Sequence, residues 1–177
     1  MRIWIAVPLA LLSLSACRGN TTTVRNTTLT APLSAATHRT AAACVLVRQD
    51  GATNLFGRSA QQVAVQNAVG AASICGWRAS TNPDPNAVGA VTYSLLVDVY
   101  DDTTHYSEET VQGAKHLDGI GEKAFMFQAA DLLSLEFVYR GQMVSMRYSI
   151  TSLLAHQDSG ASSDQLVALA KEAVGRM

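Results

Sequence analysis

The side chains best suited to metal binding or acid–base chemistry lie in one acidic stretch near the middle of the chain. Hard cations such as calcium prefer clustered carboxylates, and His105 and His116 could join such a cluster around a metal. The spacing is not that of an EF-hand, and the turn glycine of that motif is missing. We therefore interpret the stretch as a solvated loop and predict no metal site. Its carboxylates are Asp98, Asp101, Asp102, Glu108 and Glu109.

Sequence motifs of catalysis are lacking. The chain contains none of the patterns GxSxG, SxxK, HExxH and GxxxxGK[ST]. Gly119-Ile120-Gly121 lacks the third glycine of a dinucleotide fingerprint and precedes a strand pattern, which indicates a turn. Catalytic triads assemble from distant residues, so a missing motif makes an enzyme less favoured without excluding one. We predict no catalytic residues and no cofactor.

Length and composition favour one globular domain with a short appendage. The chain has 177 residues, of which 48% are hydrophobic and 15% are charged, with a formal net charge of -1. Residues 17–60 carry five arginines and one aspartate, whereas residues 61–177 carry seven basic and thirteen acidic residues. This balance offers no basic surface for nucleic acid, and we predict no nucleic-acid partner.

The N-terminus has the features of a targeting segment. Arg2 precedes an apolar stretch over residues 3–14, which is too short to span a bilayer as a helix. Leu14-Ser15-Ala16-Cys17 resembles a bacterial lipobox. That resemblance implies a lipoprotein signal peptide over residues 1–16 and fatty acyl chains, such as palmitate, on a diacylglyceryl group bonded to Cys17. A plain secretory signal is the alternative.

Residues 17–40 are predicted to form a lipidated, threonine-rich tether. The segment has no acidic residue and no apolar periodicity, so it cannot bury enough surface to offset its ordering entropy. As a flexible coil it would span roughly 25–30 Å. The membrane is thus the predicted partner through a lipid anchor, and we expect the protein on the extracytoplasmic side of the cell membrane.

Cys44 and Cys75 remain once Cys17 is acylated. An exported protein with two remaining cysteines most simply pairs them, and the bridge would close a loop worth about 3.6 kcal/mol on the loop-entropy model. Two buried free thiols are the alternative.

The periodicity of residues 41–177 predicts a single α+β domain. Alternating apolar residues predict strands over residues 91–100, 132–139 and 142–150, and shorter strand patterns lie at 62–69, 74–78 and 123–128. An early helix capped by Thr40, a helical turn from Ser107, and a terminal helix capped by Ser162 or Ser163 complete the prediction. We expect an antiparallel sheet flanked by N-terminal and C-terminal helices, with one disulfide.

Several motifs together resemble a known family. They are the lipobox, the tether, Cys44, Cys75-Gly76-Trp77, Gly119-Ile120-Gly121-Glu122-Lys123-Ala124-Phe125, the strands around Arg140-Gly141 and the terminal helix. Over residues 41–177 this combination is similar to actinobacterial, mycobacterial-type cell-envelope lipoproteins whose shared domain has no assigned function. The resemblance implies an antiparallel sheet flanked by helices, akin to the Mog1/PsbP type, and it brings no catalytic residues.

These observations favour a membrane-anchored envelope lipoprotein with a non-catalytic binding or accessory domain, whose partner would be an envelope lipid, a peptide or a protein. The alternative is a cell-wall-acting hydrolase or transferase with an unrecognised site. A ligand site, if present, is expected between the sheet and a helix near aromatic residues, although such side chains more often form the core. These aromatic residues are Trp77, Phe125, Phe127, Tyr139 and Tyr148.

Overall fold

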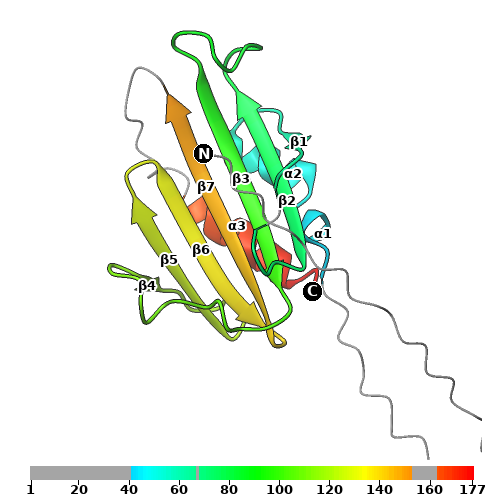
Figure 1. Ribbon diagram of the computed structural model, residues 1–177, viewed down its shortest axis with the longest axis vertical. Helices are drawn as coiled ribbons and strands as arrows, with labels where there is room; N and C mark the ends of the chain where they lie inside the picture. Colours follow the sequence, from blue (N-terminus) through cyan, green and yellow to red (C-terminus); the bar gives the residue numbers. More distant parts are fainter. Residues whose placement is uncertain (1–40, 67, 153–162) are drawn as a thin grey trace, which may run out of the picture. The chain divides into compact units, whose positions relative to one another are not determined.

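The computed structural model describes residues 41–152, apart from residue 67, and residues 163–177. Within these ranges seven strands form one antiparallel sheet, and three helices lie against one of its faces (Figure 1). The predicted α+β class, with helices at both ends of the domain, is confirmed. The predicted signal peptide, the lipidated Cys17 and the tether lie outside the described residues.

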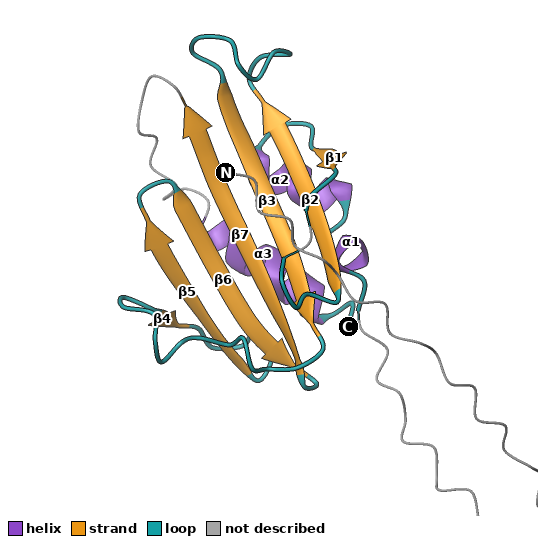
Figure 2. Cartoon of the chain, viewed as in Figure 1, coloured by secondary structure: helices purple, strands orange, loops and turns teal. Residues whose placement is uncertain are grey.

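Two antiparallel meanders make up the sheet, and they meet at its centre (Figure 2). The strand order is β1-β2-β3-β7-β6-β5-β4, and β3 pairs with β7 over all ten of its residues. The elements in chain order are α1 (Ala43–Leu46), α2 (Gln49–Phe56), β1 (Gln61–Val63), β2 (Ser73–Ser80), β3 (Val91–Tyr100), β4 (Lys115–His116), β5 (Lys123–Ala129), β6 (Leu132–Tyr139), β7 (Gln142–Ser152) and α3 (Ser163–Val174).

The core lies between the sheet and the helices. Strand residues that alternate onto the helical side, such as Leu95 and Val97 of β3 and Met146 of β7, are fully buried. The apolar stripe predicted for the terminal helix supplies the other layer, with Leu166 and Ala170 among its buried members. Apolar and polar side chains alternate along these strands, so one face of the sheet is apolar, and the helices pack against that face. In the described part of the chain, every helix is too short or too polar to cross a bilayer.

The N-terminal part of the domain differs from the prediction in three ways. The predicted helix after Thr40 is limited to α1, a separate helix, α2, forms in the segment up to Phe56 whose pattern fits a helix or a strand, and the strand predicted over residues 62–69 is limited to β1. The predicted cap Thr40 lies outside the described residues. Ala42 is the N-cap of α1, and the hydroxyl of Ser73 on β2 accepts a hydrogen bond from the backbone N–H of Ala43 at 2.9 Å.

Residues 101–114, between β3 and β4, contain the helical turn that was predicted from Ser107. The backbone N–H groups of Thr110 and Val111 both donate to the carbonyl oxygen of Ser107. Strand β4, which follows, was not predicted because it spans two exposed residues.

The predicted disulfide between Cys44 and Cys75 is present and joins α1 to β2. The two Cα atoms lie 5.1 Å apart. At the other end of α1, Nη1 of Arg176 donates to the carbonyl oxygen of Leu46 at 2.6 Å, close to the C-terminus of α3. These contacts hold both ends of a four-residue helix that is too short to be stable alone.

The motif at residues 119–125 has a structural explanation. Gly121 has a positive φ of 58°, and a Cβ at this position would collide with the carbonyl group of Val138 on β6. The carboxylate of Glu122 accepts a hydrogen bond from the backbone N–H of Arg140 at 2.9 Å, in the β6–β7 turn where Arg140 also has a positive φ. The motif therefore fastens the β4–β5 connection to the end of β6.

Candidate ligand-binding groove

We use the term open face for the side of the sheet opposite the helices, which no helix covers in the part of the chain that the structure describes (Figure 1). The strand register aligns its side chains in rows that run across the strands. One row contains Gly76, Leu96, Arg147 and Ser134 on β2, β3, β7 and β6. The next row contains Arg78, Ser94, Ser149 and Leu132 on the same four strands.

These two rows form the floor of a groove of about 350 Å³. Val63, Val65, Leu96 and Leu132 contribute its apolar lining. Arg78, Ser94, Arg147 and Ser149 contribute its polar lining. A concave, mostly apolar surface with a few converging polar groups is typical of small-molecule sites, and this volume is at the small end of their range.

One wall of the groove depends on Gly76. Beyond β1 the chain brings Val65 over β2, and a Cβ at Gly76 would lie 2.5 Å from Cγ1 of Val65 and 3.2 Å from Cγ2 of Val63. The neighbouring Cys75 and Trp77 alternate onto the helical side and are buried in the core. In the Cys-Gly-Trp motif, Cys75 and Trp77 therefore pack in the core. Gly76 has no side chain, so Val63 and Val65 of the groove wall can lie close to the sheet.

The charged side chains of the groove are two arginines. Arg147 pairs with Asp98, whose side chain is fully buried, while the side chain of Arg147 is 42% exposed. Arg78 is exposed, and no carboxylate in the described ranges pairs with it. The groove lining itself includes no acidic residue, although residues 61–177 carry an excess of acidic groups. The electrostatic character of the groove is thus opposite to that of the domain around it.

Beside the groove, residues 101–114 pack against the open face at Glu136 and Phe125. The hydroxyl of Ser107 donates to Oε2 of Glu136 at 3.2 Å, and the ring of Tyr106 packs edge-on against Phe125 with centroids 5.4 Å apart. Burial raises the pKa of Glu136, while the hydrogen bonds from Ser107 and the charge of Arg147 act in the opposite direction. This segment therefore lies over part of the open face next to the groove.

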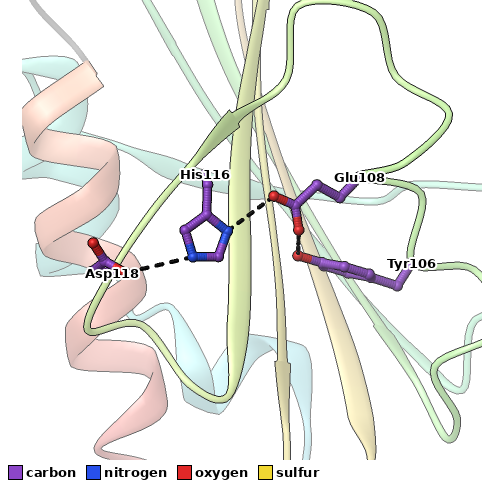
Figure 3. Close-up of polar contacts among 4 residues, drawn as sticks. All are labelled: Tyr106, Glu108, His116 and Asp118. Carbon is purple, nitrogen blue, oxygen red and sulfur yellow. Dashed lines mark hydrogen bonds and ion pairs between the residues drawn. The ribbon is translucent and has the colours of Figure 1, made fainter.

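The acidic stretch contains a second polar cluster, next to β4 (Figure 3). Nδ1 of His116 lies 3.0 Å from Oε1 of Glu108, whose other oxygen accepts a hydrogen bond of 2.7 Å from the hydroxyl of Tyr106. Nε2 of His116 lies 3.5 Å from Oδ1 of Asp118. Hydrogen bonds from Tyr106 and then from His116 lower the pKa of Glu108, and burial with the bond to Glu108 raises the pKa of Tyr106.

The arrangement of this cluster fits a structural contact between surface segments better than a catalytic centre. Both ring nitrogens of His116 face carboxylates, so neither is placed to take a proton from a nucleophile. The side chain of His116 is 57% exposed and that of Asp118 is fully exposed. His105 lies elsewhere, with its ring 4.5 Å from the ring of Tyr100. The cluster joins β4 to the segment that covers Glu136.

The acidic stretch as a whole is not the solvated loop that we predicted. Asp101 and Asp102 are exposed, but Asp98 is buried at the centre of the sheet because Arg147, 49 residues later, supplies its counter-charge. Among the residues that the structure describes, no group of three or more histidine, cysteine, aspartate or glutamate side chains is placed to hold a metal ion.

The aromatic residues near which we expected a ligand site are mainly structural. Trp77 and Tyr148 belong to the core, and Phe125 is buried on the open face. Only Trp77 among the five also contributes to the groove. The groove lies on the opposite side of the sheet from the expected position. The sequence did not predict this groove because Val63 and Val65, which form its wall, follow the alternating pattern of a β-strand.

Comparison of the chain with protein-family models, with curated proteins and with solved structures gives no match. The similarity to envelope lipoproteins and to the Mog1/PsbP type therefore stays a prediction from the sequence motifs.

Proposed function

We propose that this chain is a lipid-anchored envelope protein that binds a ligand in the groove of its open face and does not catalyse a reaction. The lipobox-like sequence before Cys17 supports the anchor. The disulfide between Cys44 and Cys75 supports an oxidising compartment outside the cytoplasm, where such bonds persist. The membrane would then hold the domain within the reach of its tether.

The groove is the observation that carries the binding function. It combines an apolar lining with two guanidinium groups, and its floor spans β2, β3, β7 and β6, whose continuous pairing holds the side chains in place. The polar cluster around His116 gives the enzymatic alternative no comparable support, because its histidine is bound by carboxylates on both sides.

Native mass spectrometry of the protein purified from the envelope of its own host tests binding. We expect a bound small molecule that is lost in the variant Val65→Asp, which places a charge in the groove wall. Val88→Asp is the matched control, since Val88 is 81% exposed and does not line the groove. A mass retained equally by both variants, or no retained mass in the wild type, would contradict the proposal.

The anchor needs a separate measurement. Intact-mass analysis of the membrane fraction should find a diacylglyceryl group on an N-terminal Cys17, and Cys17→Ser should release the protein from the membrane. An unmodified Cys17 in the mature protein would overturn the lipoprotein assignment while leaving the groove unaffected.

A further inference from the structure

We infer that the ligand of the groove is a small amphipathic anion, with one alkyl segment and one carboxylate or phosphate group. This inference rests on the binding function proposed above and specifies the ligand's chemical class. It follows from the division of the groove into an apolar part and a cationic part, from the way the two arginines are held, and from the volume enclosed.

The apolar and polar side chains of the groove allow one ligand to satisfy both kinds of contact. Val63 and Val65 form the wall above Gly76, and Leu96 and Leu132 lie in the two rows of the floor. Aliphatic side chains of this kind gain free energy by removing an alkyl chain from water and offer nothing to a sugar or a purely ionic ligand.

Hydrogen-bond donors stand in a row beside this apolar surface. Arg78 pairs in the ladder with Ser94, and Ser94 pairs with Ser149, so the three side chains are neighbours on the open face. Directly paired residues have Cβ atoms about 4.5–5.5 Å apart. Because these positions are neighbours, the guanidinium of Arg78 and the hydroxyls of Ser94 and Ser149 can converge on a single anionic group.

Arg147 adds a second cation whose position is fixed. Its Nη2 is held by the buried Asp98, its Nε is buried, and the side chain, 42% exposed as a whole, lines the groove. Asp98 acts here as a positioning residue, because a side chain that is already held loses less entropy when it binds an anion. Arg78 has no carboxylate partner within the described ranges, so its charge is available to a ligand.

The volume limits the size of the apolar part. About 350 Å³ is near the lower limit of ligand sites in proteins. A single short alkyl chain with its headgroup fits this volume, whereas a lipid with several long acyl chains does not.

Titration calorimetry tests this inference on the chain from residue 17 onward, carrying Cys17→Ser so that no attached acyl chain competes. The probes are decanoate and decyl phosphate, which represent fatty-acid and phospholipid headgroups, together with uncharged 1-decanol and inorganic phosphate. We expect both amphipathic anions to bind at least tenfold more tightly than decanol or phosphate. The preferred anion identifies the source of the headgroup. Trp77 is the single tryptophan from residue 17 onward, and its fluorescence provides a second readout.

Variants assign the binding to the groove. Arg78→Gln should weaken binding of both anions about tenfold and leave decanol unchanged, because it removes one charge-assisted contact. Arg147→Lys keeps a cation for Asp98 but removes the fork geometry, and it should weaken the anions as well. Arg140→Gln changes an exposed arginine in the β6–β7 turn, outside the groove, and is the matched control. Val65→Asp should abolish binding of every alkyl probe.

The contrary outcomes separate the two proposals. If decanol binds as tightly as decanoate, or if Arg140→Gln weakens the anions as much as Arg78→Gln, the anionic class is wrong and the binding function stands. The ligand class is also wrong if no probe binds but the native protein retains a molecule that Val65→Asp removes. If no probe binds and no molecule is retained, both proposals fall.

Discussion

The guanidinium of Arg147 on β7 holds the buried carboxylate of Asp98 on β3, with Nη2 2.5 Å from Oδ2. The two residues are diagonal neighbours, since Asp98 is paired with Ser145 and Arg147 with Leu96. Oδ1 of Asp98 has no hydrogen-bond partner in the described part of the chain. The pair therefore lies between the groove and the part of the open face that contacts residues 101–114, and the residue that holds the buried carboxylate also lines the groove.

Removal of Arg147 should destabilise the domain. In Arg147→Ala the carboxylate of Asp98 stays buried without its counter-ion, and we expect the free energy of unfolding to fall by about 2–3 kcal/mol in urea denaturation. The double variant with Asp98→Asn removes the unpaired charge and should recover about half of that loss. Additive losses in the two single variants would show that the ion pair is not what stabilises this position.

The carboxyl group of Glu136 should make stability depend on pH. Burial raises its pKa in the folded protein above the ordinary value of 4.5. The folded protein therefore keeps this proton more strongly than the unfolded chain. The contribution of Glu136 to the free energy of unfolding is thus fully present below the ordinary pKa and is lost as pH rises through the raised one. Glu136→Gln should lack this fall when unfolding is measured over a pH series. Parallel pH profiles of the variant and the wild type would refute the assignment.

The disulfide should supply a large part of the stability of the N-terminal segment. Cys44 and Cys75 are 31 residues apart, and on the loop-entropy model their cross-link is worth about 3.6 kcal/mol. The double variant Cys44→Ala with Cys75→Ala should lose roughly this amount in urea denaturation. Addition of a reductant should destabilise the wild type to a similar extent and have no effect on the double variant. An effect of reductant on the double variant would point to another cause.

Gly121 and Gly119 make a matched pair. Both have positive φ, but only at Gly121 would a Cβ meet backbone, at the carbonyl of Val138. We expect Gly119→Ala to cost about 1 kcal/mol for backbone strain alone, and Gly121→Ala to cost about 2 kcal/mol more. Thermal unfolding of the two variants measures the difference. Equal losses would mean that the contact with β6 adjusts without cost.

Tyr106 should control the titration of Glu108. Its hydroxyl donates the hydrogen bond that contributes most to the lowered pKa of Glu108, and His116 contributes the second. Tyr106→Phe keeps the ring against Phe125 and should raise the pKa of Glu108 toward 4.5, as followed by NMR of the carboxyl carbon. His116→Gln should cause a smaller rise. The opposite order of the two effects would mean that His116, not Tyr106, dominates the cluster.

The central strands could be predicted from the sequence because each has one apolar face. The alternation over residues 91–100 and 142–150 is regular, and both stretches form strands, with β7 continuing to Ser152. The disulfide followed from the two cysteines that remain once Cys17 is assigned to the lipid anchor, together with the expectation of export. Such features depend on local pattern or on counting, so no knowledge of the strand register is needed.

The groove and the buried ion pair could not be predicted because they depend on contacts between distant residues. Asp98 belongs to an acidic stretch, where exposure is expected. Its burial is explained only by the pairing of β3 with β7, which places Arg147 beside it. Val65 continues an alternating pattern, yet it leaves the ladder and packs over Gly76. The pairing of β2, β3, β7 and β6 aligns the two rows of the groove floor. This register depends on contacts between strands far apart in the sequence, so it could not be predicted from local residue patterns.

If the protein is anchored through Cys17, as we propose, the position of the disulfide has a mechanical consequence. Tension applied at Ala41 reaches Cys44 within three residues and passes through the sulfur atoms into Cys75, in the second strand of the sheet. A pulling force therefore cannot peel α1 or β1 away one turn at a time. The load passes directly to β2, which pairs with β1 on one side and with β3 over eight residues on the other.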